Sequence, residues 1–174
     1  MKFLEKFDIV PNDEQLYEIA FTHSSYSAKH DLDYDYERLE FLGDSVLSVV
    51  VADYLYNNFK NLPEGELTKL RASLVCEKSL CSFSRELNIG EFLNLGKGEE
   101  KGGGRERDSI LADAFEAVLA AIYLDGGMEE ARRFVLRFVL PELKHRDDEV
   151  FKDYKTALQE IIQRNPEESV TYHL

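Results

Sequence analysis

Two pairs of carboxylates stand out in the sequence because each lies in a largely apolar segment, on a helix face that carries no Lys or Arg. Glu40 and Asp44 fall in ERLEFLGDSVLSVVV and are four residues apart. Asp113 and Glu116 are the only charged residues of SILADAFEAVLAAIYL and are three residues apart. Residues at these spacings share one face of a helix. A carboxylate buried without a partner costs several kcal/mol, so these groups are expected to protonate or to bind a cation.

The chemistry of the four side chains indicates which cation they suit. All are hard oxygen ligands, and neither histidine nor cysteine accompanies them, which favours Mg²⁺ or Mn²⁺ and disfavours zinc. A di-iron helical bundle is excluded, because it requires Glu-x-x-His pairs and this chain has Glu-x-x-Glu and Asp-x-x-Glu. A solvated acidic face stays open as the alternative, since acidic rows at helical spacing usually face water.

Helical periodicity predicts the elements that must position these groups, and the fold class it indicates is all-α. The predicted helices span residues 13–22, 37–59, 64–87 with a break near 76–78, 109–124, 128–143 and 153–163. The stretch between the first two is expected to be a polar connector, in which His23 packs or caps a helix. The Gly-rich stretch 96–108 is expected to be mobile, serving either as a contact to RNA or as a flexible linker.

Composition limits the partners and the compartment. The chain has 174 residues and a formal net charge of −13, which alone argues against a polyanionic partner. Two cysteines form no disulfide framework and suggest a reducing compartment. The N-terminus lacks the apolar core of a signal peptide, and no apolar run is long enough to cross a bilayer. We therefore expect a cytoplasmic protein with no membrane partner.

The nonapeptide ERLEFLGDS at 37–45 resembles the signature of the ribonuclease III family. The resemblance extends, in the family order, to FTHSSY at 21–26, to EGELTKLRASLV at 64–75 and to LGKGEEKGGGRERDSILADAFEA at 95–117. It covers about residues 10–140. It implies the helical endonuclease domain of a bacterial-type ribonuclease III, which is an endoribonuclease specific for double-stranded RNA.

The resemblance also implies roles for individual residues. It gives a metal-binding set and a catalytic set, which overlap: metal ligands Glu40, Asp44, Asp113 and Glu116; catalytic groups Asp44, Glu116, Glu37 and Glu64. Glu37 and Glu64 match acidic positions that line the cleavage cleft, although compensation of a helix dipole alone could explain Glu64. Phe41 matches the aromatic residue that inserts into a socket on the partner subunit. Tyr36 departs from the family, which commonly has asparagine there.

The implied reaction is Mg²⁺-dependent, two-metal hydrolysis of phosphodiesters, with Mn²⁺ as a possible substitute. In the family it leaves 5′-phosphate and 3′-hydroxyl ends with a short 3′ overhang, and a homodimer cuts the two strands. The implied roles are processing of ribosomal RNA, messenger RNA and other structured precursors. A non-cleaving RNA-binding module of the same fold is the alternative, and the intact set of four carboxylates argues against it.

The C-terminal residues 153–174 resemble the start of an α/β double-stranded RNA-binding domain. We therefore predict an endonuclease domain over residues 1–145, a linker over 146–152 and an incomplete RNA-binding domain over 153–174. The resemblance implies that the portion in which the family keeps much of its basic surface is missing, and we expect this to explain the acidic balance of the chain.

Overall fold

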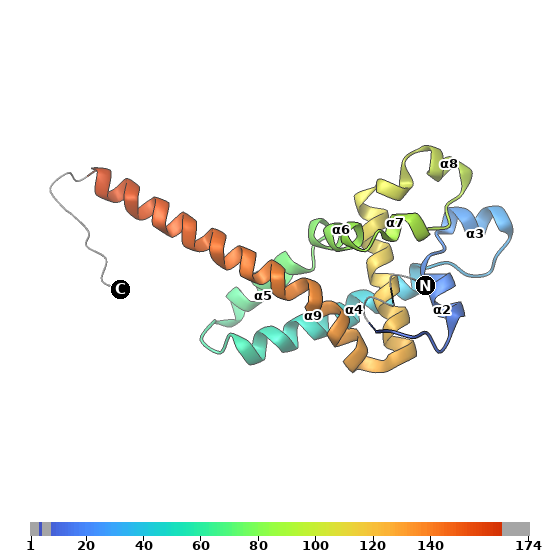
Figure 1. Ribbon diagram of the computed structural model, residues 1–174, viewed down its shortest axis with the longest axis horizontal. Helices are drawn as coiled ribbons and strands as arrows, with labels where there is room; N and C mark the ends of the chain where they lie inside the picture. Colours follow the sequence, from blue (N-terminus) through green and yellow to red (C-terminus); the bar gives the residue numbers. More distant parts are fainter. Residues whose placement is uncertain (1–3, 5–7, 165–174) are drawn as a thin grey trace. The chain divides into compact units, whose positions relative to one another are not determined.

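The computed structural model describes residue 4 and residues 8–164, and it describes side chains as far as residue 144 (Figure 1). The chain divides into two compact units, residues 1–139 and residues 140–174. All the predicted site residues lie in the first unit, which is described below by itself.

The described residues confirm the all-α prediction. Their helices, in chain order, are α2 (Glu14–Ala20), α3 (Ser24–His30), α4 (Glu37–Asn58), α5 (Glu64–Leu74), α6 (Glu77–Glu86), α7 (Ile89–Phe92), α8 (Lys97–Lys101), the 3₁₀ helix η1 (Gly104–Glu106) and α9 (Asp108–Arg164). The one β-type pairing among them is an isolated parallel bridge between Thr22 and Asn94. None of the described helices is long and apolar enough to cross a membrane.

The apolar segments singled out in the sequence form the two central helices. α4 keeps a row of buried aliphatic residues along its length, including Leu47, Val50 and Val51. The first part of α9 is buried almost continuously from Ile110 to Ile122, apart from the half-buried carboxylates. Packing against these helices, rather than helix propensity, therefore stabilises the first unit.

An aromatic cluster fills the space between α6 and both parts of α9. Phe115 lies 5.7 Å from Phe83, 5.5 Å from Phe134 and 5.6 Å from Phe138, measured between ring centroids. These distances are in the range at which aromatic pairs attract. The aromatic cluster therefore holds in place the part of α9 that carries Asp113 and Glu116.

A glycine ends the first part of α9. Gly127 has φ 84° and ψ −178°, which interrupts the helical conformation before the chain continues as a helix. A positive φ of this kind favours glycine, because a Cβ atom would be strained there. The amphipathic segment 128–143 then follows, with Ala131, Phe134, Val135 and Phe138 buried.

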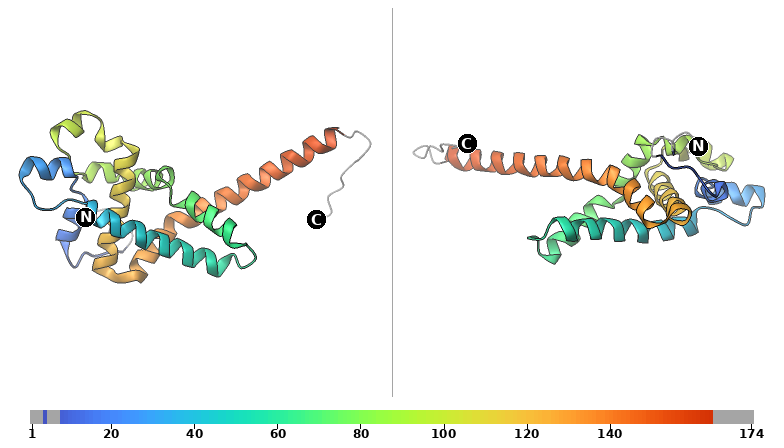
Figure 2. Two further views of the ribbon diagram at one scale, coloured as in Figure 1. Left: turned by 180° about the vertical axis from the view of Figure 1, so that it is seen from behind. Right: turned by 60° about the horizontal axis from the view of Figure 1, so that its bottom comes forward.

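The predicted helix 64–87 is divided where the break was expected. α5 ends at Leu74, and α6 begins at Glu77 after Cys76 adopts an extended conformation, with φ −78° and ψ 157°. α5 returns alongside α4 as a helical hairpin, which both views of Figure 2 show.

Two predictions about irregular segments were wrong. The connector before α4 contains α3, and His23 begins this helix because its Nδ1 accepts a hydrogen bond of 3.0 Å from the backbone N–H of Ser25. The capping role expected for His23 is thereby confirmed. The stretch 96–108, expected to be a mobile loop, forms α8 and η1.

A single arginine explains the order of the Gly-rich stretch. The Arg105 guanidinium donates to the carbonyl oxygens of Gly90 and Leu93, both at 2.8 Å, and to the Glu100 carboxylate at 2.6 and 2.7 Å. Five N–H donors in one planar group can satisfy several acceptors at once. The contacts of Arg105 therefore order this segment despite its glycine content.

The structure describes only part of the C-terminal segment for which a linker and the start of an RNA-binding domain were predicted. α9 continues as a helix over residues 145–164, a range that includes the predicted linker and the start of the predicted RNA-binding domain. The strand expected at the end of the chain lies in residues 165–174, outside the described residues. The division at 145, 146–152 and 153–174 stays a prediction.

Candidate metal centre

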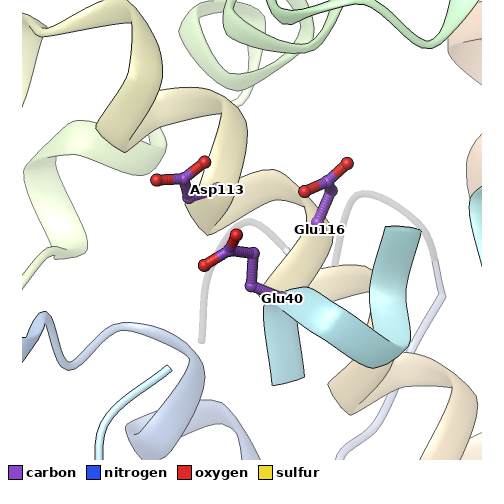
Figure 3. A group of neighbouring side chains, drawn as sticks. All are labelled: Glu40, Asp113 and Glu116. Atoms are coloured by element: carbon purple, nitrogen blue, oxygen red, sulfur yellow. The ribbon is translucent and has the colours of Figure 1, made fainter. Parts of the chain in front are cut away.

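Three of the predicted carboxylates meet where α4 crosses the first part of α9. Glu40 extends from α4, while Asp113 and Glu116 extend from one face of α9 (Figure 3). Each offers one carboxylate oxygen, and these three oxygens lie within 4.8 Å of one another. All three side chains are half-buried. The structure thus brings together residues that are more than 70 positions apart in the sequence.

Gly43 permits this close approach of the two helices. A Cβ atom built on Gly43 would lie 1.9 Å from the carbonyl oxygen of Glu116 and 2.5 Å from its carbonyl carbon. Any side chain at this position would therefore separate the backbones of α4 and α9. The sequence signal was an isolated glycine inside an apolar helix, which usually has a packing reason.

The carboxylates of the cluster have no salt-bridge partner among the described residues. None of the ion pairs formed by the described residues includes Glu40, Asp113 or Glu116. Burial raises the pKa of Glu116 to about 8, and the charges of Asp44, Glu40 and Asp113 add to the effect. Burial likewise raises the pKa of Glu40, and the charge of Asp113 adds to this effect. Burial also raises the pKa of Asp113, and the charge of Glu77 adds to that effect.

These properties fit a bound divalent cation. Carboxylates that repel one another are stabilised when a cation replaces the protons that they would otherwise retain. The donors are all oxygen, which is the ligand type of Mg²⁺ and Mn²⁺. The solvated-face alternative is disfavoured here, because solvated carboxylates do not have pKa values raised by burial.

Asp44 and Glu37 lie at the edge of this cluster. Both side chains are exposed, and neither is among the three residues whose oxygens converge. The charge of Asp44 nevertheless raises the pKa of Glu116, and the charge of Glu37 raises that of Glu40, after burial in each case. They therefore face the cluster from the exposed side of α4.

Glu64 and Phe41 stand apart from the three converging carboxylates. Glu64 begins α5 and accepts a hydrogen bond of 2.8 Å from the hydroxyl of Thr68. Phe41 is 78% exposed, although it adjoins Glu40 on α4. It is one of three exposed large apolar side chains of α4, together with Val49 and Tyr56.

Two further residues lie near the cluster, although the sequence did not assign them to it. Glu77, at the start of α6, raises the pKa of Asp113, as noted above. Tyr36, directly before α4, is only 3% exposed, and Asp113 and Glu40 are the charges that most raise the pKa of its hydroxyl after burial. No spacing rule links either residue to the carboxylates, because both depend on how separate helices pack.

The raised pKa of Glu116 predicts how stability depends on pH in the absence of metal. The folded state retains this proton up to pH about 8, whereas the unfolded chain loses it near 4.5. The contribution of Glu116 to the free energy of unfolding is therefore complete below pH 4.5 and is lost as the pH rises to 8. At about 1.4 kcal/mol per pH unit, the loss is at most about 5 kcal/mol.

Urea denaturation in EDTA at several pH values between 5 and 8 measures this dependence. Glu116→Gln should remove most of the slope, whereas the exposed control Glu86→Gln in α6 should leave it unchanged. A wild-type free energy of unfolding that stays constant or rises over this range would contradict the burial of an uncompensated carboxylate.

Comparison with known proteins gives the family. A family profile described as Ribonuclease-III-like matches residues 13–143. Ribonuclease 3 of Moorella thermoacetica is 49% identical over 172 residues, covering 99% of this chain and 74% of the relative. Ribonuclease 3 of Oceanobacillus iheyensis is 52% identical over 157 residues, covering 89% of this chain and 69% of the relative.

Solved structures agree. The nuclease domain of ribonuclease III from Campylobacter jejuni superposes with a TM-score of 0.75 and 43% identity, covering 79% of this chain and 94% of that domain. Dicer from Pichia stipitis superposes with a TM-score of 0.57 and 31% identity, covering 77% of this chain and 57% of Dicer. The chain belongs to the ribonuclease III family, and it is an endoribonuclease of that type.

Proposed function

We propose that this enzyme cleaves double-stranded RNA with Mg²⁺ as its cofactor, and that Mn²⁺ can substitute. The observation that carries the proposal is the uncompensated carboxylate cluster of Glu40, Asp113 and Glu116 in a chain of the ribonuclease III family. Its substrates are precursors of ribosomal RNA, messenger RNA and other structured transcripts. We place the enzyme in the cytoplasm, where such precursors occur and where thiols stay reduced.

The residues of the cluster act by holding metal and orienting water and phosphate. Bound Mg²⁺ supplies a water of lowered pKa and neutralises charge on the phosphodiester. Asp44 completes the ligand set from the exposed side of α4, next to the three carboxylates that converge. By the two-metal chemistry that the family resemblance implies, hydrolysis here would leave a 5′-phosphate and a 3′-hydroxyl and would need no histidine base.

A second copy of the chain is the partner that the exposed face of α4 best fits. Phe41, Val49 and Tyr56 are 78%, 57% and 74% exposed, and their spacing places them within about 80° of one another around the helix. Leu42, the residue after Phe41, lines a cavity of about 600 Å³ whose other lining side chains are both aliphatic and polar: Ile19, Leu32, Leu39, Leu124, Asp33, Tyr34, Asp35 and Arg38. In a two-fold dimer, Phe41 of each copy can enter this cavity of the other copy. The dimer then has two sites that cut opposite strands, which gives the short 3′ overhang.

The position of Glu64 is also explained by a dimer. Glu64 begins α5, the helix that returns from the far end of α4. That end of α4 lies about 27 Å along the helix axis from Glu40. It is thus remote from the carboxylates of its own chain, and a second copy can present it to the same cleft. Glu37 and Glu64 then line the cleft in which the duplex lies.

Phe41→Ala is expected to weaken dimerisation by about 30-fold, corresponding to about 2 kcal/mol for loss of a buried aromatic anchor. Sedimentation equilibrium measures the dissociation constant directly. Val10→Ala is the matched control, because Val10 is 82% exposed and precedes α2 rather than lying on α4. An unchanged dissociation constant for Phe41→Ala would rule out the socket contact.

Cleavage of a long RNA duplex at low salt tests the proposed function. Low salt favours binding, because affinity for phosphates falls steeply as salt rises. We expect cutting with Mg²⁺ or Mn²⁺, no cutting in EDTA and no cutting of a single strand of the same sequence, with 5′-phosphate ends on the products. Binding of the duplex without cutting in either metal would instead favour a non-cleaving module.

A further inference from the structure

Three consecutive residues of α6 contact one face of the first turns of α9. The contacts are a ring contact of 5.7 Å between Phe83 and Phe115, a hydrogen bond of 2.5 Å from the Ser84 hydroxyl to the Leu111 carbonyl, and an ion pair between Arg85 and Asp108. Asp113 and Glu116 lie about 140° around the helix from this face, since each residue turns the helix by about 100°. The rotation of α9 against α6 therefore decides where these two carboxylates point.

Apolar burial holds α9 only from Ile110 onward. Ile110 is 4% exposed and Leu111 is 1% exposed, whereas residues 106–109 are exposed. An exposed helix end frays unless other contacts hold it, because its first N–H groups lack partners within the helix. The position of the first turn of α9 must therefore come from polar contacts.

Arg85 supplies polar contacts on both sides of the point where α9 begins. Its guanidinium donates to the carbonyl oxygen of Glu106, the last residue of η1, at 3.2 Å, and to Oδ1 of Asp108, the first residue of α9. On α6 it donates to the Sγ atom of Cys81, one turn earlier, at 3.2 Å. A planar group with five N–H donors can satisfy such separate acceptors at once. Arg85 therefore joins α6 to the end of η1 and to the start of α9.

The exposure of this ion pair indicates what its role is. The side chains of Arg85 and Asp108 are 45% and 56% exposed, and ion pairs of this kind usually contribute little to stability. The contact nevertheless lies five residues before Asp113, on a helix whose rotation orients the carboxylates. Its main effect is therefore expected on the geometry of the metal centre rather than on the free energy of unfolding.

We propose that Arg85 is a positioning residue of the metal centre, which fixes the start of α9 so that Asp113 and Glu116 are directed toward Glu40. The inference rests on the metal site of the proposed function. Without the guanidinium, the exposed first turn of α9 can rotate or fray, and repulsion among the ionised carboxylates favours arrangements in which they no longer converge. Metal then binds more weakly, because only the fraction of molecules with converging carboxylates can bind it.

Calorimetric titration of the metal-free protein with Mn²⁺ tests this role without RNA or turnover. Arg85→Gln should weaken Mn²⁺ binding about fivefold. Arg85→Lys should weaken it about threefold, because a single ammonium group keeps the charge but cannot reach Glu106, Asp108 and Cys81 together. In cleavage assays both variants should need more Mg²⁺ for the half-maximal rate, with little change in the rate at saturating Mg²⁺.

Two further substitutions show whether the effect arises from this contact. Arg133→Gln is the matched control, because Arg133 forms an ion pair with Glu130 in the second part of α9 and its side chain is 59% exposed. It should leave the Mn²⁺ affinity unchanged. Asp108→Ala removes only the acceptor on α9 and should weaken Mn²⁺ binding about threefold. The double variant with Arg85→Gln should bind no more weakly than Arg85→Gln alone, because both substitutions break the same contact.

The outcomes separate this inference from the proposed function. Mn²⁺ binding by the wild type with equal affinity in Arg85→Gln would overturn the role of Arg85 and leave the metal site standing, whereas absence of Mn²⁺ binding in the wild type would overturn both. Full wild-type affinity in Arg85→Lys would contradict the bridging geometry. If Arg85→Gln does not fold, Asp108→Ala decides in its place. Lower stability in EDTA with unchanged Mn²⁺ affinity, in either variant, would assign the contact to folding and equally overturn the inference.

Discussion

Glu116→Gln should lower the rate of Mg²⁺-dependent cleavage of duplex RNA on the order of 1,000-fold, which corresponds to about 4 kcal/mol of transition-state stabilisation. The substitution keeps the size of the side chain but removes the charge of the most strongly perturbed carboxylate in the cluster. A neutral amide cannot replace a carboxylate at a site where the attraction to the cation is the main interaction. Initial rates at saturating Mg²⁺ measure the effect.

The control for this experiment distinguishes loss of the site from loss of the fold. Glu86→Gln makes the same change at an exposed position of α6 and should cleave at the wild-type rate. In EDTA, Glu116→Gln should be at least as stable as the wild type near pH 8, because it no longer buries a charge. Cleavage by Glu116→Gln within a few-fold of wild type would remove Glu116 from the ligand set.

Gly43→Ala should destabilise the protein by about 3 kcal/mol or more and should also impair cleavage. The added Cβ would lie 1.9 Å from the carbonyl oxygen of Glu116, so one backbone must move away from the other. The neighbour is a peptide group of α9 rather than the end of a flexible side chain, and the helix cannot give way locally. Glu40 and Glu116 would then separate, because Glu116 lies at the point of contact and Glu40 is three residues from Gly43.

Urea denaturation measures this free energy, and Gly65→Ala is the matched control. Gly65 also lies within a helix, α5, but a Cβ built there would meet nothing within 4 Å. Alanine at an open helical position stabilises by about 0.5–1 kcal/mol relative to glycine. The two substitutions should therefore have opposite signs. Equal effects at the two positions would show that the contact between α4 and α9 is not as close as described.

The convergence of Glu40, Asp113 and Glu116 could be anticipated in part from the sequence. Spacing placed each set on one face of an apolar helix, and the missing counter-charges predicted that the carboxylates protonate or bind a cation. The same argument does not determine which oxygens converge. Asp44 has the same charge and adjoins the same cluster, yet its position on the exposed side of α4 depends on where Gly43 allows the helices to cross.

The wrong predictions have a common physical cause. Glycine and charge content in residues 96–108 indicated a mobile loop, because composition reports only local preferences. The order comes instead from Arg105, which bonds carbonyl groups 12 and 15 residues earlier in the chain. Similarly, α3 is fixed by the hydrogen bond of 2.9 Å from Gly96 N to the Ser25 hydroxyl. Long-range contacts of this kind have no periodic signature.

Location of Mn²⁺ by anomalous X-ray scattering, in crystals grown with MnCl₂ and without RNA, tests the central claim most directly. An anomalous peak bounded by the carboxylates of Glu40, Asp113 and Glu116, and lost in Glu116→Gln crystals, is the result that we predict. Crystals in which these carboxylates stay within reach of one another but show no peak at saturating Mn²⁺ would contradict the assignment of the cluster as the metal centre.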